Sequence, residues 1–257
     1  MAPALAVGVS LAVALAACRA GALTAGGAAA ATLVGTAILG STGWSGAAVV
    51  GAFFVPSTLV GRLALRRPGA SDARGERRDA VQVLANGGAA AAGALAEYRA
   101  PGLGLWIATA ALAAAAADTW ATSLGAWSPT EPRHLVSGRR VTRGTSGGVS
   151  LTGTAAGVAG ALCVAAAGAA ARGTVPLALW GTVIGIAGML LDSLLGATVQ
   201  ARFACPGCGL PSERRRHRCG TPTQLTEGWG WLDNDGVNAL STVFAALAGA
   251  LAWSWAS

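Results

Sequence analysis

The chain has 257 residues, of which 53% are hydrophobic and only 11% are charged. A soluble domain carries about 25% charged residues, so this composition, with a mean hydropathy of +0.55, excludes an ordinary soluble globular protein. The formal net charge of +7 would suggest a nucleic-acid partner in a soluble protein, but in a membrane protein it indicates positively charged cytoplasmic loops. We therefore expect a membrane protein with no nucleic-acid partner.

Long apolar runs recur along the chain, and in a bilayer such runs form helices because lipid offers the backbone no hydrogen-bond partners. The runs predict eight transmembrane helices, at residues 3–18, 22–40, 43–62, 79–98, 102–124, 148–171, 175–200 and 237–255. The predicted fold class is an all-α, polytopic membrane helix bundle. We expect residues 1–257 to form a single integral-membrane domain.

Polar loops are predicted at 63–78, 125–147 and 201–236. With the N-terminus outside, all three loops and Arg19 lie on one side, which then holds 16 of the 18 Arg residues. The positive-inside rule makes that side cytoplasmic. The absence of Lys and the abundance of Ala and Gly are typical of a GC-rich bacterial genome, so we expect a multi-pass protein of the bacterial plasma (inner) membrane, with its active-site loops in the cytoplasm.

The helix predicted at 79–98 begins with polar residues. Asp79, Gln82 and Asn86 are spaced i, i+3 and i+7, which places them on one helical face, and together they are typical of one wall of a polar cavity. Asp79 alone is equally explained as a helix-start residue. Arg77 and Arg78, directly before it, suit phosphate clamps or simply a positive loop at the membrane.

The next helix ends in a carboxylate that a membrane span would normally avoid. Asp118 and Thr122 are one turn apart near the end of the run at 102–124. Burying a carboxylate at the centre of a span costs about 2.5–3.5 kcal/mol, but near a helix end the cost is lower. Asp118 is therefore either a site residue or a carboxylate at the membrane interface.

The second loop has the chemistry of an anion-binding segment. Its sequence SGRRVTRGTSGGVS leads into a helix, and glycines together with helix-start N–H groups favour the close approach of an anion. It matches neither a Walker A loop nor the GxGxxG fingerprint. The candidate phosphate-binding residues are Arg139, Arg140, Arg143, Gly144, Thr145, Ser146, Gly147 and Gly148.

The helix at 175–200 carries Asp192 within a stripe of small residues. Such stripes let helices approach closely in lipid, so Asp192 is expected to face protein. A structural hydrogen bond to a neighbouring helix is the alternative to a site role. The stripe consists of Gly181, Gly185, Gly188 and Gly196.

The third loop, at 201–236, is cysteine-rich and resembles a zinc knuckle. Cys205 and Cys208 have the CxxC spacing of zinc ligands, and His217 with Cys219 completes a Cys₃His set. We expect a structural Zn²⁺ here, with free thiols and a redox role as the alternatives. A disulfide is not expected in a reducing cytoplasm.

The last helix is entered through a cluster of oxygen-bearing side chains. Asp233, Asn234, Asp235 and Asn238 follow one another within a turn and a half. Such a cluster either caps the helix or, since it exceeds what capping needs, suits Mg²⁺.

Five blocks together resemble the integral-membrane family that includes plant phytyl phosphate kinase. They are DAVQVLANGG, ADTWATSLG, GRRVTRGTSGGVS, LDSLLGATVQ, and CPGCG with HRCGTPT through WLDND. The resemblance runs from about residue 43 to the end of the chain. It departs at Ser123, where members of this family usually have Glu.

This resemblance implies a Mg²⁺-dependent phosphotransferase of the membrane. It would transfer a phosphoryl group from a nucleoside triphosphate, CTP, to an isoprenyl monophosphate resembling phytyl or geranylgeranyl phosphate, giving the diphosphate. Asp118, Asp192, Asp233, Asp235 and Asn238 would provide metal ligands, and Asp79 and Asn86 would orient them. The arginines at 77, 78, 139, 140 and 143 and the Gly144–Gly148 segment would bind phosphates.

The expected partners are the nucleotide, the isoprenyl phosphate lipid and the bilayer, and a homo-oligomer stays open. Two other function classes use the same features. A carrier or flippase for a prenyl phosphate would need the anion-binding pocket without phosphoryl transfer. A membrane assembly protein would use the zinc loop for docking and the Asp residues as contacts between helices.

Overall fold

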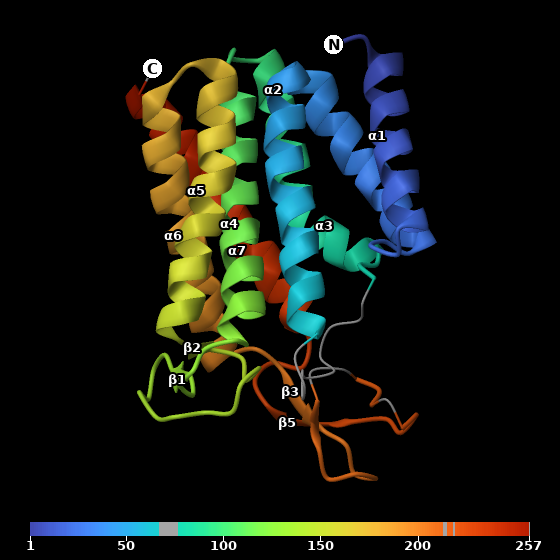
Figure 1. Cartoon of the computed structure of the whole chain (residues 1–257), viewed down its shortest axis with the longest axis vertical. Helices are drawn as coiled ribbons and strands as arrows, with labels where there is room; N and C mark the ends of the chain where they lie inside the picture. The colour runs from blue at the N-terminus through green and yellow to red at the C-terminus, as the bar shows by residue number, and fades with distance from the viewer. Residues whose placement is uncertain (67–76, 213–214, 218, 257) are drawn as a thin grey trace.

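The computed structural model describes residues 1–66, 77–212, 215–217 and 219–256 (Figure 1). The predicted all-α polytopic membrane class is confirmed. The helices of the described residues are α1 (Pro3–Arg19), α2 (Ala25–Leu65), α3 (Ala80–Ala94), α4 (Leu103–Gly125), α5 (Leu151–Arg172), α6 (Val175–Thr198) and α7 (Asn234–Ala256), with the short 3-10 helix η1 (Leu95–Tyr98) continuing α3.

Helix α4 forms the centre of the bundle. It contacts α2, α3, α5, α6 and α7, and these five contact one another in a closed ring around it, while α1 packs against α2. The alanines of α4 explain this position, because small side chains let neighbouring helices come close. Its 23 residues give a length of about 34 Å, enough for a hydrocarbon core of about 30 Å.

Helix α2 is broken at Gly43, whose φ of 67° and ψ of −148° are not helical. A residue with a Cβ rarely adopts a positive φ, so glycine permits the break. Just before the break, the Thr42 hydroxyl donates to Ile38 O (2.7 Å). Figure 1 shows the two halves of α2 running along the bundle in opposite senses, which corresponds to the helices predicted at 22–40 and 43–62.

The predicted count of eight spans is not confirmed. Among the described residues, five helices are long and apolar enough to cross a membrane, namely α2, α4, α5, α6 and α7. With 17 and 15 residues, α1 and α3 are shorter than the roughly 20 residues that a full span needs. The predicted loop at 63–78 lies mostly outside the described residues.

Both termini lie at one end of the bundle, and the long loops lie at the other (Figure 1). Exposed tryptophans are found near each end. Trp180 and Trp255 form an edge-to-face pair with ring centroids 6.0 Å apart, and Trp229 and Trp231 form a stacked pair at 5.6 Å. Tryptophan is enriched at membrane–water interfaces, so the two pairs are placed as a membrane protein requires.

The loop end carries two small antiparallel sheets. Strands β1 (Arg133–His134) and β2 (Gly148–Val149) form one, and β3 (Arg202–Ala204) lies between β4 (Pro211–Ser212) and β5 (Gln224–Glu227) in the other. Phe203 of β3, Cys205 directly after β3, and Leu232 are buried. We call the described residues of 126–150 and 199–233 the loop layer. The three buried side chains give it only a small apolar core.

The contact between α4 and α6 depends on glycine, which gives a first testable prediction. A Cβ built on Gly188 would lie 2.5 Å from the Cβ of Ala114, whereas one built on Gly51 in α2 would meet nothing within 4 Å. Alanine favours a helix over glycine by about 1 kcal/mol, but overpacking a core costs about 1–3 kcal/mol. We expect Gly188→Ala to lower the thermal unfolding midpoint in detergent and the control Gly51→Ala to maintain or raise it. Equal midpoints for the two variants would contradict this packing.

Candidate functional site

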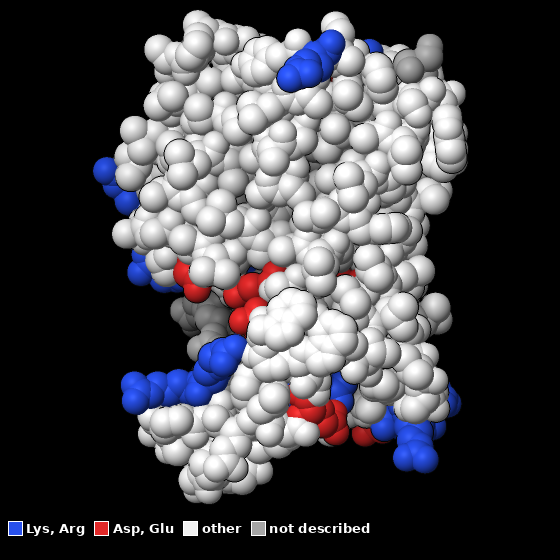
Figure 2. Space-filling model, turned by 180° about the vertical axis from the view of Figure 1, so that it is seen from behind, with Lys and Arg blue, Asp and Glu red and all other residues white. Residues whose placement is uncertain are grey.

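A cavity of about 600 Å³ opens at the loop end of the bundle. Its walls come from the loop-side ends of α2 to α7 and from the loop between α4 and α5. Figure 2 shows acidic side chains gathered where the bundle meets the loop layer, with basic side chains around and below them. Ligand pockets typically have volumes of about 300–1,000 Å³, so the cavity is large enough for a phosphorylated ligand.

Most residues predicted to contact phosphate or magnesium line this one cavity, although they come from distant parts of the chain. They are Arg78, Asn86, Asp118, Arg143, Gly144, Thr145, Ser146, Gly147, Gly148, Asp192, Asp235 and Asn238.

Two predicted carboxylates lie outside the lining and cap helices. Asp79 forms a capping box at the start of α3: its Oδ1 accepts from the N–H of Gln82 (3.0 Å), and the Gln82 side chain accepts from the N–H of Asp79 (3.1 Å). Asp233 accepts from the N–H of Gly236 (3.1 Å) at the start of α7. Both carboxylates therefore cap helix starts, which was the alternative to a site role for each of them.

Three predicted arginines also lie outside the lining. The Arg77 guanidinium donates to Leu23 O (2.8 and 3.1 Å), which ties the entry to α3 to the segment between α1 and α2. Arg139 and Arg140 are exposed near the turn that follows β1. Of the five predicted arginines, Arg78 and Arg143 are the two in the cavity wall.

The carboxylates of the cavity come from three helices. Asp118 on α4 is 8% exposed, Asp192 on α6 accepts from the Ser241 hydroxyl of α7 (3.4 Å), and Asp235 lies in the first turn of α7. The predicted structural hydrogen bond of Asp192 to a neighbouring helix is thus present, in a residue that also faces the cavity. Asn238, 6% exposed, adds an amide to the same wall.

The dipoles of the surrounding helices suit a cavity that holds both anions and cations. Helices α3, α5 and α7 begin at this end of the bundle, and α2, α4 and α6 end there. Helix N-termini favour anions and C-termini favour cations. Asp118 lies in the last two turns of α4, and its carboxylate favours a cation at this wall.

Residues Gly144–Gly148, which we call the glycine-rich loop, line the cavity in the connection between α4 and α5. Gly144 and Gly147 have φ values of 85° and 75°, which favour glycine. A Cβ on Gly147 would overlap Ala197 of α6, so this loop lies directly on the end of α6. Arg143 is held on the other side, where its guanidinium donates to Ser128 O (3.0 Å).

The structure adds cavity residues that the sequence did not single out. Gln200, 4% exposed, follows α6 and donates to the Ser146 hydroxyl (3.0 Å). Arg62, in the last turn of α2, and Glu131 also line the cavity. Ser123, which stands where Glu was expected from the resemblance, is 8% exposed and lines it as well. The polar residue directly after an apolar helix was the available signal for Gln200.

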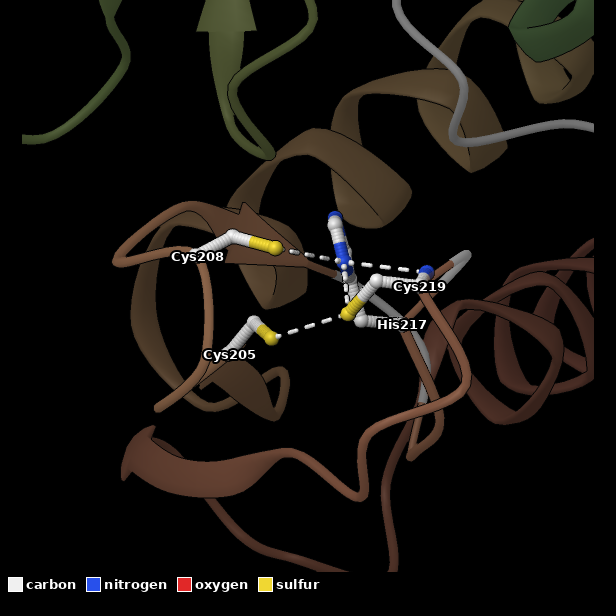
Figure 3. A group of neighbouring side chains, drawn as sticks. All are labelled: Cys205, Cys208, His217 and Cys219. Carbon is white, nitrogen blue, oxygen red and sulfur yellow. Dashed lines mark hydrogen bonds between the residues drawn. The ribbon is translucent and has the colours of Figure 1, made fainter.

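The predicted zinc ligands converge in the loop layer (Figure 3). The ligand atoms of Cys205, Cys208, His217 and Cys219 all lie within 4.8 Å of one another. The Sγ atoms of Cys205 and Cys219 are 3.6 Å apart, and His217 Nδ1 lies 3.7 Å from Cys208 Sγ and 3.2 Å from Cys219 Sγ. Zn–S bonds of about 2.3 Å in a tetrahedron separate ligand atoms by roughly 3.8 Å. The set therefore fits a tetrahedral metal such as zinc.

The thiols of this cluster perturb one another. Hydrogen bonding with Thr221 and then with His217 lowers the pKa of Cys219 to about 5. Hydrogen bonding with Cys219 and then Cys205 raises the pKa of Cys208 to about 11. All five cysteines of the chain are free. A thiolate at Cys219 is the form that binds a metal.

The cluster gives a second testable prediction. We expect the purified protein to contain about one zinc per chain and Cys205→Ser to lose most of it, since even changes of outer-shell partners cost about 10–100-fold in metal affinity and Cys205 would be a direct ligand. Cys163→Ser is the matched control, because Cys163 lies on α5, away from the cluster. Elemental analysis by mass spectrometry measures both variants. Wild-type protein without zinc, or equal zinc in both variants, would rule out the site.

Among the described residues, the Cys₃His set is the one group of three or more Asp, Glu, His or Cys residues that brings its ligand atoms this close together. Asp118, Asp192 and Asp235 face the same cavity without forming a closed cage. Magnesium usually keeps several waters and takes one or two carboxylates together with substrate phosphates. A magnesium ion at these three carboxylates would therefore need further oxygen ligands from water or a bound phosphate.

Comparison with known proteins places these features in a family. The family model "Integral membrane protein DUF92" matches residues 8–246. "Uncharacterized membrane protein MJ0933" of Methanocaldococcus jannaschii is 30% identical over 199 residues, which cover 77% of this chain and 72% of the relative. "Protein PGR" of Arabidopsis thaliana is 30% identical over 141 residues, covering 48% of this chain and 46% of the relative. No solved structure matches the chain.

Proposed function

The chain belongs to the DUF92 family of integral membrane proteins, and we propose that it is a membrane kinase of isoprenyl phosphates. It would transfer a phosphoryl group from a nucleoside triphosphate, CTP in the first instance, to a phytyl- or geranylgeranyl-like monophosphate. The observation that carries this proposal is the single cavity in which guanidinium groups, a glycine-rich loop and carboxylates meet.

The cavity addresses the main difficulty of this reaction. The acceptor phosphate is itself an anionic nucleophile, so it needs little help from a general base, but two anions must be brought together in line. Arg78 and Arg143 offset that repulsion, and the backbone of Gly144–Gly148 is placed to hold phosphate oxygens. The nucleoside triphosphate would lie against this loop.

Asp118, Asp192 and Asp235, with Asn238, are the residues that would hold Mg²⁺. When bound, the ion supplies positive charge to the phosphate oxygens of the nucleotide. The carboxylates would fix the ion between α4, α6 and α7.

The position of the cavity suits a substrate with a lipid tail. Gly61, Ala64 and Leu65, in the last turns of α2, line its wall, while Leu63 on the same turns is 47% exposed on the outside of the bundle. An isoprenyl chain leaving the cavity along this wall would enter the hydrocarbon region directly. The headgroup would remain at the loop end of the bundle, which would face the cytoplasm if the protein lies in a bacterial plasma membrane.

A carrier and an assembly protein are distinguished from the kinase by one set of assays. Purified protein in nanodiscs is incubated with Mg²⁺, each nucleoside triphosphate and prenyl monophosphates of several chain lengths, and proteoliposomes are tested for transbilayer movement of the same lipids. The proposal expects lipid diphosphate that depends on both nucleotide and Mg²⁺. Lipid movement without nucleotide indicates a carrier, and the absence of both reactions for all chain lengths refutes the kinase.

A further inference from the structure

The glycine-rich loop is held from one side by two residues that follow α6. Gln200 donates to the Ser146 hydroxyl (3.0 Å). The Arg202 guanidinium donates to Ser146 O (3.1 Å) and to Gly196 O (3.2 Å). A single guanidinium thus joins the loop backbone to the last turns of α6, and its side chain is 29% exposed.

These two residues lead directly into the Cys₃His cluster. Arg202 opens β3, and Cys205, 1% exposed, is the residue after its end. Arg202 also pairs with Glu227 at the end of β5 (2.8 Å), and its carbonyl accepts from the Thr226 hydroxyl (3.0 Å). The strand that contacts the glycine-rich loop through Arg202 therefore leads directly into the cluster's first ligand.

The cluster joins segments that a small apolar core holds weakly. Cys205 and Cys208 lie on the turn between β3 and β4, whereas His217 and Cys219 lie on the segment that leads to β5 (Figure 3). A metal bound to all four would cross-link the turn between β3 and β4 to the segment between β4 and β5. Small units with little core depend on such cross-links for their stability.

We propose that Gln200 and Arg202 are positioning residues for the glycine-rich loop, and that metal at the Cys₃His cluster fixes the strand from which they act. Metal loading in the loop layer thus sets the affinity of the cavity for the phosphates of its nucleotide. This inference rests on the proposed function, but its structural half, the ordering of the loop, is independent of any reaction.

The test uses the full chain in nanodiscs and compares four single variants, and the double variant Arg202→Gln/Cys205→Ser, with wild type. Arg202→Gln removes the guanidinium and Arg202→Lys retains the charge, while Cys205→Ser removes a metal ligand. The control is Arg133→Gln. Arg133 opens β1, and its backbone pairs with Val149 of β2, but its exposed side chain donates to Gly138 O and does not line the cavity, so the substitution leaves the backbone pairing in place. The readouts are zinc content, the Kd and KM for CTP, kcat, and hydrogen–deuterium exchange of residues 142–150.

We expect Arg202→Gln to raise the Kd and KM for CTP at least about tenfold, which corresponds to one lost charge-assisted hydrogen bond, with zinc content and kcat little changed. Arg202→Lys should recover part of the loss, and Arg133→Gln should match wild type. Cys205→Ser should lose zinc and raise KM to a similar extent. Both Arg202→Gln and Cys205→Ser should speed exchange in residues 142–150, and the double variant should be no worse than the stronger single one.

Three results would overturn the inference. Loss of zinc from Cys205→Ser with unchanged KM and unchanged exchange would separate the metal from the loop. A fall in kcat alone for Arg202→Gln would assign the arginine to the chemistry and not to positioning. Unchanged exchange in Arg202→Gln would remove the positioning role. If wild type neither binds nor turns over any nucleotide, the proposed function fails, and the exchange readout still decides whether zinc and Arg202 order the loop.

Discussion

Replacing Asp118 by Asn is expected to lower prenyl diphosphate formation at least about 100-fold, because loss of a single group that stabilises transition-state charge costs 10²–10³ in kcat. Asp118 is the buried carboxylate on the central helix, at the wall where three helices contribute acidic groups. An amide has the same shape but no charge to hold Mg²⁺. The rate of label transfer from CTP to a prenyl monophosphate measures the effect.

The fold should survive this change, since a neutral amide is cheaper to bury than a carboxylate. The matched control is Glu97→Gln, which removes a carboxylate charge at the opposite end of the bundle, where Glu97 pairs with Arg172 (3.5 Å). We expect Glu97→Gln to lower the thermal unfolding midpoint and to keep the activity. We expect Asp118→Asn to lose the activity and to keep or raise the thermal unfolding midpoint. An Asp118→Asn variant as active as wild type would exclude the Asp118 carboxylate from the reaction.

Replacing Gly147 by Ala is expected to weaken nucleotide binding roughly tenfold or more, an effect of at least about 1.4 kcal/mol. Gly147 has a positive φ, and a Cβ there would overlap Ala197 of α6. The glycine-rich loop would have to move away from α6 and so from Gln200. The KM and Kd for CTP measure the resulting loss of nucleotide binding.

Gly138 separates the two costs of this substitution. Gly138 lies in the same connection between α4 and α5, outside the glycine-rich loop. Its φ is 67°, and a Cβ built there meets nothing within 4 Å. Gly138→Ala therefore carries the backbone strain, about 1–2 kcal/mol, without the collision. We expect its KM to stay near wild type. Equal KM values for Gly138→Ala and Gly147→Ala would mean that contact of the loop with α6 does not shape the cavity.

Most of the helices were predictable because long apolar runs mark them in the sequence. The run at 102–124 became Leu103–Gly125, and the run at 175–200 became Val175–Thr198. The last helix starts earlier than its predicted residue 237, since Asn234 and Asp235 already belong to α7. Acidic residues are favourable in a first helical turn. Part of the polar cluster, which the sequence placed just before the helix, therefore forms its first turn. Membership of the integral-membrane family was also predicted and is confirmed.

The candidate site could be predicted in its chemistry but not in its selection of residues. Asp79 and Asp118 are equally conspicuous in the sequence, yet Asp79 caps α3 and Asp118 faces the cavity. Which role a carboxylate takes depends on a backbone N–H three residues away and on the packing of the bundle. The support from Gln200 and Arg202 was not predictable, because it depends on how strands of two to four residues pair, and such strands leave no periodic signal.

The measurement that tests the central claim most directly is a single-turnover transfer with CTP labelled at its γ-phosphate. Purified wild-type protein in nanodiscs is mixed with Mg²⁺, the labelled nucleotide and geranylgeranyl or phytyl monophosphate, and the lipid products are separated. The proposed kinase predicts a lipid diphosphate that carries the label on its terminal phosphate, and Asp118→Asn should form it at least about 100-fold more slowly. Label that stays in CTP or appears only as inorganic phosphate, for both lipids, would contradict the account.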